Sequence, residues 1–316
     1  MSSLSSLSPR RASRGFQALS GEVPELPEVE TVRRDIARLF SGDTLDGLAV
    51  TGRRTVRRHP PEMLSVLQGQ ALTSVGRHGK YLLLAWTGGK ALILHLRMSG
   101  QLLVAKVGSP TAAHTHAVLS FAKGGELRFI DPRTFGEMFL AGQGAGGLAV
   151  ATPASHRSGA SSSGSAWELP SELAHLGPDA LEVGPVYLAS KLAGRRAPLK
   201  SLLTDQRVLA GIGNIYADEI CFDAGLRPDR AAGSLRRPQV GQLARSTLAV
   251  LGAAIEARGS TLGDQQYRDL LGDIGGFQLQ HKVYGRASLP CTTCGREIDR
   301  VRFGARRAYL CPACQR

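Results

Sequence analysis

Apolar residues recur with a helical period close to the start of the chain. They lie at intervals that place them on one face of a helix, namely Val29, Val32, Ile36, Leu39 and Phe40. This pattern predicts an amphipathic helix that ends at Phe40, before the sequence SGD. Pro27 would fall in the first helical turn, where a proline is tolerated because its missing N–H has no partner there.

Six short apolar runs separated by glycine turns follow between residues 71 and 130. They are ALTSV, YLLLAW, ALILHL, QLLVA, AVLSF and ELRFI. The sequences TGGK, MSGQ and KGGE between them resemble hairpin connections. Because no long helical pattern separates the runs, we expect an antiparallel sandwich or barrel rather than a parallel sheet. The longest apolar run is one strand long, far short of the ~20 residues that a membrane span needs, so we expect a soluble protein.

The composition changes after the last strand. Gly, Ala and Ser dominate residues 141–166, which predicts a flexible interdomain insertion. Helical patterns then prevail from Leu169 to about Gly259. The most informative stretch predicts a helix, the glycine turn GIG and a second helix that Asn214 opens. Such a turn suits a phosphate, with Asn214 capping the helix and its N–H groups facing the anion. It also suits an ordinary helix hairpin.

The overall charge narrows the choice of partner. The chain has 316 residues, enough for two or three domains, and a formal net charge of +13. This charge favours a polyanion such as nucleic acid over a merely basic enzyme. Most of its 39 basic residues are arginines, which suit phosphate, although a G+C-rich genome produces the same bias.

Four of the five cysteines lie in the last 26 residues, in two C-x2-C pairs separated by sixteen residues. This spacing predicts one structural Zn²⁺ rather than two disulfides or a redox pair. A closed set of four thiolates leaves no open position, so the metal should fold the intervening hairpin. The expected ligands are Cys291, Cys294, Cys311 and Cys314.

The sequence VPELPEVET carries the most reactive candidate group. An internal proline has an amide nitrogen and is no nucleophile, whereas an N-terminal proline is a secondary amine. If Pro24 were N-terminal, its amine could attack the C1′ carbon of a damaged nucleoside and form an iminium. Glu25 or Glu28 could then move protons. The same residues could instead form a rigid start of a helix with no catalytic role. The local pattern alone favours that interpretation.

The motifs taken together resemble the formamidopyrimidine-DNA glycosylases. PELPEVET, RHGKYLLL, HLRMSGQL, DPRTFG, HLGPDAL, AGIGNIYADE, VYGR and the four-cysteine hairpin follow in that family's order. The resemblance covers the chain from Pro24 to Arg316, apart from the Gly/Ser insertion. The related endonuclease VIII family usually begins Pro-Glu-Gly-Pro, so Leu26 favours the formamidopyrimidine branch.

The resemblance implies an α+β fold: an N-terminal antiparallel β-sandwich with a leading helix, a helix–two-turn–helix domain and a C-terminal zinc β-hairpin. The expected segments are a non-native or cleaved extension (1–23), the catalytic sandwich (24–140), the insertion (141–168), the DNA-binding helical domain (169–258), and the lesion-loop region with the zinc hairpin (259–316). We expect a monomer in the bacterial cytoplasm, associated with DNA.

The implied activity is that of a bifunctional DNA glycosylase and abasic-site lyase of base excision repair. Such an enzyme excises 8-oxoguanine and formamidopyrimidines from double-stranded DNA, then cuts the strand by β,δ-elimination. Pro24 would be the nucleophile, Glu25 its acid/base partner and Glu28 a supporting carboxylate. Lys80 resembles the lysine that contacts the phosphate beside the lesion.

The resemblance also implies a set of DNA contacts. Met98, Arg133 and Phe135 would fill the gap that the flipped nucleotide leaves. Asn214 and Arg306 would clamp phosphates; Arg306 is preferred to Arg307 because it lies five positions before Cys311. His114 is also expected to contact DNA. The sequence GDIGGFQLQ departs from the usual pattern of the loop over the extruded base, so lesion preference stays open between oxidised purines and pyrimidines.

Residues 1–23 leave two functional alternatives. If Val23 marks the true start, read from a GTG codon and then removed, the Pro24 amine is free; cleavage of a targeting peptide would have the same result. If the segment is retained, the chain is instead expected to be a non-catalytic binder of abasic or distorted DNA.

Overall fold

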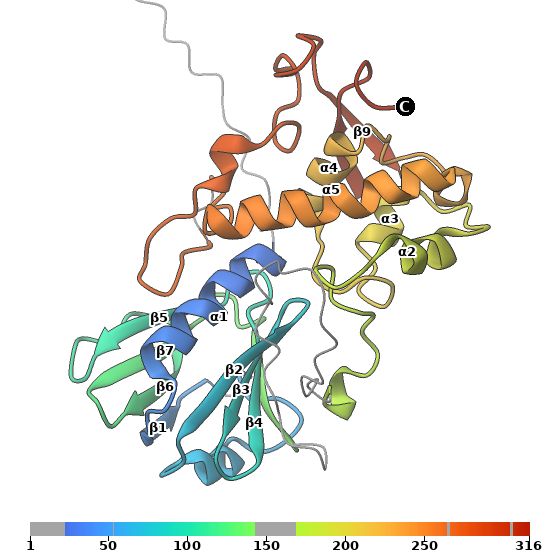
Figure 1. Ribbon diagram of the computed structural model, residues 1–316. Helices are drawn as coiled ribbons and strands as arrows, with labels where there is room; N and C mark the ends of the chain where they lie inside the picture. The colour runs from blue at the N-terminus through green and yellow to red at the C-terminus, as the bar shows by residue number, and fades with distance from the viewer. Residues whose placement is uncertain (1–22, 53, 143–168, 264–265, 304–305) are drawn as a thin grey trace, which may run out of the picture.

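The computed structural model describes residues 23–52, 54–142, 169–263, 266–303 and 306–316, without the side chains of residues 303 and 306. Most of the predicted N-terminal extension and of the Gly/Ser insertion therefore lies outside the described residues. Figure 1 shows two lobes, one built on β-sheets and the other on helices with a small hairpin. The first helix of the chain lies between them.

The N-terminal lobe is a β-sandwich of two four-stranded antiparallel sheets, with strand orders β1-β6-β7-β5 and β2-β3-β4-β8. The strands are β1 (Leu45–Val50), β2 (Leu72–His78), β3 (Tyr81–Trp86), β4 (Lys90–His95), β5 (Gln101–Lys106), β6 (Thr115–Phe121), β7 (Gly125–Ile130) and β8 (Glu137–Gly142). Buried residues of both sheets, such as Leu94 and Phe129, form one core with the first helix. The predicted sandwich is confirmed.

All six predicted strands are present, and the sequence pattern missed β1 and β8. Leu45 is the only buried residue of β1, so this strand has too weak an apolar pattern to be recognised. The expected hairpin at MSGQ is wrong. Strand β4 pairs with β3 and β8, whereas β5 pairs with β7, so this turn carries the chain from one sheet to the other.

Helix α1 (Leu26–Phe40) agrees with the predicted amphipathic helix and includes Pro27 in its first turn. Four of the five predicted apolar positions are buried, whereas Leu39 is 42% exposed. The first turn reaches beyond the sandwich, because the Leu26 side chain belongs to the core of the helical lobe. Helix α1 therefore fixes the two lobes to each other.

The helical lobe comprises α2 (Pro185–Leu192), α3 (Leu199–Leu203), α4 (Asn214–Asp223) and α5 (Arg237–Glu256). Its core includes Tyr216 and Ile220 of α4 and Leu243 and Leu251 of α5. Helix α5 runs across α1 at the junction of the lobes (Figure 1). Short 3-10 turns complete the two lobes: η1 (Pro61–Leu67), η2 (Ser171–Leu173), η3 (Ala232–Ser234) and η4 (Phe277–Gln280).

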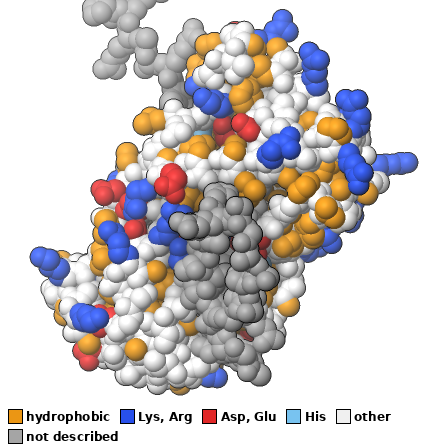
Figure 2. All heavy atoms as spheres, viewed as in Figure 1, with side chains coloured by type: hydrophobic (Ala, Val, Ile, Leu, Met, Phe, Trp, Pro, Cys, Tyr) orange, Lys and Arg blue, Asp and Glu red, His pale blue; other side chains and the backbone are white. Residues whose placement is uncertain are grey.

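The C-terminal hairpin pairs β9 (Asp299–Phe303) with β10 (Arg306–Leu310) in antiparallel register. On the face shown in Figure 2, Lys and Arg side chains stand along the rim of the helical lobe and the hairpin. Among the described residues, no helix combines the length and the apolar character that a membrane crossing requires.

Candidate catalytic and DNA-binding site

The carboxylate of Glu25 lies at the N-terminus of α4. It is 1% exposed and accepts hydrogen bonds from the backbone N–H groups of Gly213 at 2.6 Å, Ile215 at 2.9 Å and Tyr216 at 3.4 Å. A helix N-terminus favours an anion, and here that anion is a side chain of the protein. The expectation that Asn214 caps α4 and leaves these N–H groups to a phosphate is therefore wrong, since the N-cap residue is Gly213.

Glu28 contacts the peptide bond between Pro24 and Glu25. Its carboxylate accepts hydrogen bonds from the Glu25 N–H at 2.8 Å, the Ser260 N–H at 2.7 Å and the Tyr216 hydroxyl at 2.5 Å. Burial raises the pKa of Glu28 although these three hydrogen bonds oppose the shift. This carboxyl group therefore connects the start of α1 to α4 and to the segment that follows α5.

The hydrogen-bond network continues away from Glu28. The Ser260 hydroxyl lies 3.1 Å from the Tyr216 hydroxyl and 3.1 Å from His281 Nε2. Burial lowers the pKa of His281 to about 4, so the imidazole is neutral near pH 7. Tyr216, Ser260 and His281 were not identified from the sequence, because each lies in a different segment and acquires its role only through these contacts.

Pro24 is buried and borders a cavity of about 20 Å³, whose other lining residues include Glu28, Ser260 and Tyr267. A space of this size holds about one water molecule and is too small for a purine. The segment that follows α5 forms part of its wall. A nucleoside therefore does not fit in this space as it stands.

The side chains of Lys80 and Glu25 both lie against Gly213. A Cβ atom added to Gly213 would lie 2.4 Å from Glu25 Oε1 and 2.6 Å from Lys80 Nζ, so a larger residue would displace these two side chains. Lys80 follows Gly79 in the tight turn between β2 and β3. The structure thus brings the predicted lysine and the predicted acid/base residue to one point.

A buried ion-pair network fixes the turn that carries Lys80. The Asp179 carboxylate accepts hydrogen bonds from the Gly79 N–H at 2.8 Å and from Arg77 Nη1 at 2.5 Å. Arg77 Nε also donates a hydrogen bond to the Glu30 carboxylate at 3.0 Å. The arginines beside Glu30 hold its pKa down at about 2, against the effect of burial. Asp179 belongs to the motif HLGPDAL, which was recognised in the sequence without a role for this residue.

Two loops at one end of the sandwich carry the predicted gap-filling residues. Met98 lies between β4 and β5, whereas Arg133 and Phe135 lie between β7 and β8. The Arg133 guanidinium carbon is 4.8 Å from the centroid of the Phe135 ring, and Phe135 is 43% exposed. An exposed aromatic ring beside a cation is suited to stack on bases.

Asp131 joins these two loops. Its fully buried carboxylate accepts the Ser99 hydroxyl at 2.5 Å, the Arg133 N–H at 3.2 Å and the Gly136 N–H at 2.6 Å. Ser99 follows Met98 directly. One carboxylate thus connects both loops, and the sequence pattern had assigned it no role beyond the motif DPRTFG.

The remaining predicted DNA contacts lie on three separate elements. His114 is exposed, and its carbonyl accepts the Asp131 N–H at 3.0 Å, which places it beside the Arg133 loop. Asn214 is exposed at the first residue of α4. Arg306 is the first residue of β10, opposite Phe303, and its side chain lies outside the described part of the chain.

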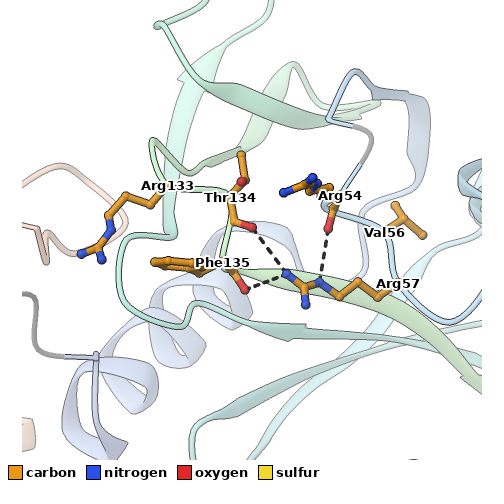
Figure 3. A pocket seen from close by; sticks show the side chains of 6 residues that line it. All are labelled: Arg54, Val56, Arg57, Arg133, Thr134 and Phe135. Atoms are coloured by element: carbon orange, nitrogen blue, oxygen red, sulfur yellow. Dashed lines mark hydrogen bonds between the residues drawn. The ribbon is translucent and has the colours of Figure 1, made fainter.

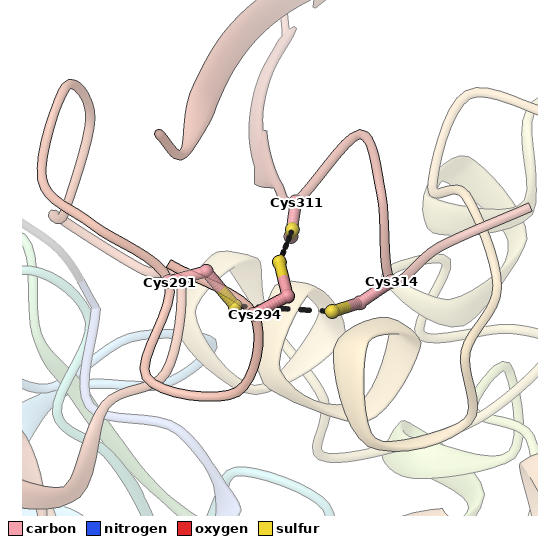
Figure 4. A group of neighbouring side chains, drawn as sticks. All are labelled: Cys291, Cys294, Cys311 and Cys314. Atoms are coloured by element: carbon pink, nitrogen blue, oxygen red, sulfur yellow. Dashed lines mark hydrogen bonds between the residues drawn. The ribbon is translucent and has the colours of Figure 1, made fainter. Parts of the chain in front are cut away.

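The four predicted zinc ligands come together at the base of the hairpin (Figure 4). Their sulfur atoms all lie within 4.8 Å of one another, with 3.9 Å between Cys291 and Cys314 and 3.4 Å between Cys294 and Cys311. Tetrahedral Zn²⁺ with Zn–S bonds of about 2.3 Å requires sulfur separations of about 3.8 Å. The cluster fits this geometry, and the chain holds one structural zinc there.

A buried ion pair attaches the hairpin to the helices. Lys200 Nζ donates to Asp218 Oδ2 at 2.9 Å and to the Arg307 carbonyl at 2.7 Å, and Asp218 accepts the Tyr309 N–H at 3.0 Å. Burial raises the pKa of Asp218 to about 7, although Lys200 opposes the shift. Helices α3 and α4 and strand β10 therefore meet at a single pair of charges.

Removal of one partner of this pair should destabilise the helical lobe strongly. We expect Lys200→Met to lower the free energy of unfolding by about 3–5 kcal/mol, because Asp218 would remain buried without a cation. Denaturant titration followed by circular dichroism measures the change. The double variant Lys200→Met/Asp218→Leu should recover most of the loss; a double variant as unstable as the single one would contradict this explanation.

Comparison with known proteins agrees with the geometry. Three family models match in chain order: the formamidopyrimidine-DNA glycosylase N-terminal domain over residues 23–138, the H2TH domain of the same enzymes over 176–266, and a zinc finger found in FPG and IleRS over 288–316. The fold and the site therefore define a DNA glycosylase of the helix–two-turn–helix class with a zinc hairpin.

Individual relatives extend this match to nearly the whole chain. The formamidopyrimidine-DNA glycosylase of Cereibacter sphaeroides is 40% identical over 306 residues, covering 93% of this chain and all of the relative. The MutM (Fpg) protein of Thermus thermophilus is 38% identical with a TM-score of 0.75, covering 92% and 98% of the two chains. Lactococcus lactis Fpg bound to DNA with an abasic site is 28% identical with a TM-score of 0.76, covering 92% and 99%. The chain belongs to the formamidopyrimidine-DNA glycosylase family.

Proposed function

We propose that this glycosylase excises oxidised purines from double-stranded DNA and then cuts the strand at the resulting abasic site. The observation that carries the proposal is the meeting of Pro24, Glu25, Glu28 and Lys80 where α1 contacts the N-terminus of α4. Lactococcus lactis Fpg has been solved with DNA containing an abasic site and with DNA containing Fapy-dG, which supports damaged DNA as the partner of this chain.

The chemistry begins at the nitrogen of Pro24. Its lone pair bonds to C1′ of the damaged nucleotide as the bond from C1′ to the base breaks. The base leaves with that electron pair and takes up a proton from solvent, while the proline nitrogen loses its proton to the Glu25 carboxylate. Glu25 then protonates the ring oxygen O4′ as its bond to C1′ breaks, which leaves an iminium. Loss of a C2′ proton expels the 3′ phosphate, a second elimination expels the 5′ phosphate, and water releases the proline.

This mechanism requires Pro24 to be the first residue. With Val23 attached, the nitrogen of Pro24 is an amide and has no available lone pair. The match to the family's N-terminal domain begins at residue 23, which supports a working chain that starts there and loses that residue. Initiation at Val23 followed by removal of the initiator methionine, or cleavage of a targeting peptide, produces the same free amine.

The proposed DNA contacts follow from the positions of the side chains. Lys80 and Asn214 stand at the catalytic point and bind phosphates beside the lesion, and Arg306 on the zinc hairpin binds another. Met98, Arg133 and Phe135 enter the helix stack from the loops that Asp131 joins, with His114 next to them. We propose that the chain is divided as expected from its sequence, into segments 1–23, 24–140, 141–168, 169–258 and 259–316. We also propose a monomeric enzyme of the bacterial cytoplasm, and sedimentation of its complex with one duplex tests the monomer.

Replacement of Glu25 by Gln should reduce catalysis without loss of binding. We expect Glu25→Gln to slow single-turnover excision of 8-oxoguanine by about 10²–10⁴-fold, because the amide cannot supply the proton for O4′. Its single oxygen keeps part of the hydrogen bonds from α4, and the proposed phosphate contacts are unchanged, so affinity for an uncleavable abasic-site analogue should change little. Glu62→Gln, an exposed residue of η1, is the matched control; equal excision rates for the two variants would contradict the role of Glu25.

The choice of substrate has a direct test. Oxidised-purine specificity predicts faster excision of 8-oxoguanine than of thymine glycol from otherwise identical duplexes. Faster excision of thymine glycol would assign the chain to oxidised pyrimidines and overturn this part of the proposal.

A further inference from the structure

A groove beside the Arg133 loop is separate from the proposed catalytic residues Pro24, Glu25 and Lys80. We propose that this groove binds a phosphate of the DNA strand opposite the lesion, with Arg54 as its principal contact. The inference rests on the proposed function, because it assumes that damaged duplex DNA lies across the site. It adds a contact to the intact strand, whereas Lys80, Asn214 and Arg306 are assigned to phosphates around the lesion.

The groove has a volume of about 410 Å³ and two walls (Figure 3). One wall is the segment before η1 with Arg54, Val56 and Arg57, and the other is the loop with Arg133, Thr134 and Phe135. Three of these six residues are arginines and none is acidic. A concave surface with this charge concentrates anions, and its volume is several times that of a phosphate group.

Arg54 and Arg57, two of the three arginines that line the groove, differ in their contacts. Arg57 donates from Nη2 to the carbonyls of Thr134 at 3.4 Å and Phe135 at 3.3 Å, and from Nε to the Arg54 carbonyl at 3.3 Å. Arg57 therefore fixes the groove wall to the Phe135 loop. The guanidinium of Arg54 is exposed and has no hydrogen-bond or ion-pair partner within the part of the chain that the structure describes, so it can bind an external anion at little cost.

Strand register places this groove in line with the catalytic lysine. Tyr81, which follows Lys80, pairs with His95, and His95 pairs with Glu137. Val56 then forms a parallel bridge with Met138, beyond β8. At one end of these neighbouring strands, Lys80, the Phe135 loop and the Arg54 groove therefore follow one another across the sheet.

The row is long enough to span the minor groove of a duplex. Three strand spacings of about 4.8 Å amount to about 14 Å. The two phosphate backbones flank a minor groove about 6 Å wide, and inserted side chains widen and kink the duplex there. With Lys80 on the damaged strand and Phe135 in the base stack, the next group along the row reaches the opposite backbone.

The test combines protein and DNA changes. The full protein would be titrated with abasic-analogue duplexes in which single phosphates of the intact strand are replaced by neutral methylphosphonates. For the unsubstituted protein, we expect one or two positions near the base opposite the lesion to weaken binding by about tenfold. With Arg54→Ala these positions should lose their effect, and the slope of log affinity against log salt should become shallower by about 1.

Two variants serve as controls. Lys123→Ala changes an exposed lysine in the β6–β7 turn, at the opposite end of that hairpin from the Arg133 loop, and should match the unsubstituted protein. Lys80→Met should weaken binding but keep the sensitivity to the intact strand. Thermal unfolding checks that each variant is folded.

The possible outcomes separate this inference from the proposed function. If the unsubstituted protein excises 8-oxoguanine but Arg54→Ala leaves the salt slope and every methylphosphonate effect unchanged, the groove does not bind the intact strand and the inference is wrong. If the protein binds these duplexes as expected but excises no lesion, the contact stands and the proposed activity falls.

Discussion

A chain that begins at Pro24 should form a covalent adduct with abasic DNA in the presence of borohydride, whereas a chain that retains residues 1–23 should not. Borohydride reduces the iminium that the free N-terminal amine forms with C1′. Because an acylated proline nitrogen is no nucleophile, we expect the retained segment to lower excision of 8-oxoguanine by at least about 10³-fold, as removal of a catalytic nucleophile does. Gel electrophoresis of the trapped complex measures the adduct, and intact-mass measurement identifies the N-terminus of each chain.

Both chains should still bind an abasic-site analogue, since Lys80, Asn214 and the zinc hairpin do not depend on the free amine. A chain beginning with Pro24→Gly, whose N-terminal amine is primary, is a useful control because it should still be trapped, but more slowly. An active protein that starts at Pro24 and yields no adduct would exclude the iminium mechanism. If the native protein keeps residues 1–23 and binds abasic DNA without cutting it, the alternative of a non-catalytic binder is correct.

Removal of the structural zinc should abolish specific DNA binding. The four thiolates repel one another without the metal, and zinc binding contributes about 10–16 kcal/mol to the folding of small zinc-finger peptides. We therefore expect the β9–β10 hairpin to unfold on chelation and to carry Arg306 away from the DNA, so that affinity for an abasic-site duplex falls by at least about 100-fold. Metal analysis, together with binding assays before and after chelation, measures both quantities.

The chain supplies a matched control for this experiment. Cys294→Ser removes a ligand and should reproduce the effect of chelation, whereas Cys221→Ala changes a buried cysteine of α4 outside the metal cluster and should keep the zinc. The Lys200–Asp218 pair lies between α4 and the hairpin, so loss of zinc should also lower the stability of the helical lobe. Unchanged binding after verified loss of zinc would show that the hairpin does not carry the Arg306 contact.

Local patterns in the sequence were sufficient for most elements of this fold. The apolar period of residues 29–40 predicted α1, the glycine-bounded apolar runs predicted six strands, and the cysteine spacing predicted the metal site. Each of these signals depends on residues close together in the chain. The order of short motifs then indicated the family and named Pro24, Glu25 and Lys80 as candidates.

Contacts between distant segments were decided by the tertiary structure alone. The Glu25 carboxylate occupies the N-terminus of a helix 188 residues further along the chain, Asp131 joins two loops, and β4 and β5 belong to different sheets. A strand's alternation shows which face is buried but not which strand it pairs with, and a buried carboxylate is satisfied by whichever N–H groups the fold brings to it. Short motifs therefore identify the reactive groups, whereas the fold sets their orientation and their remaining contacts.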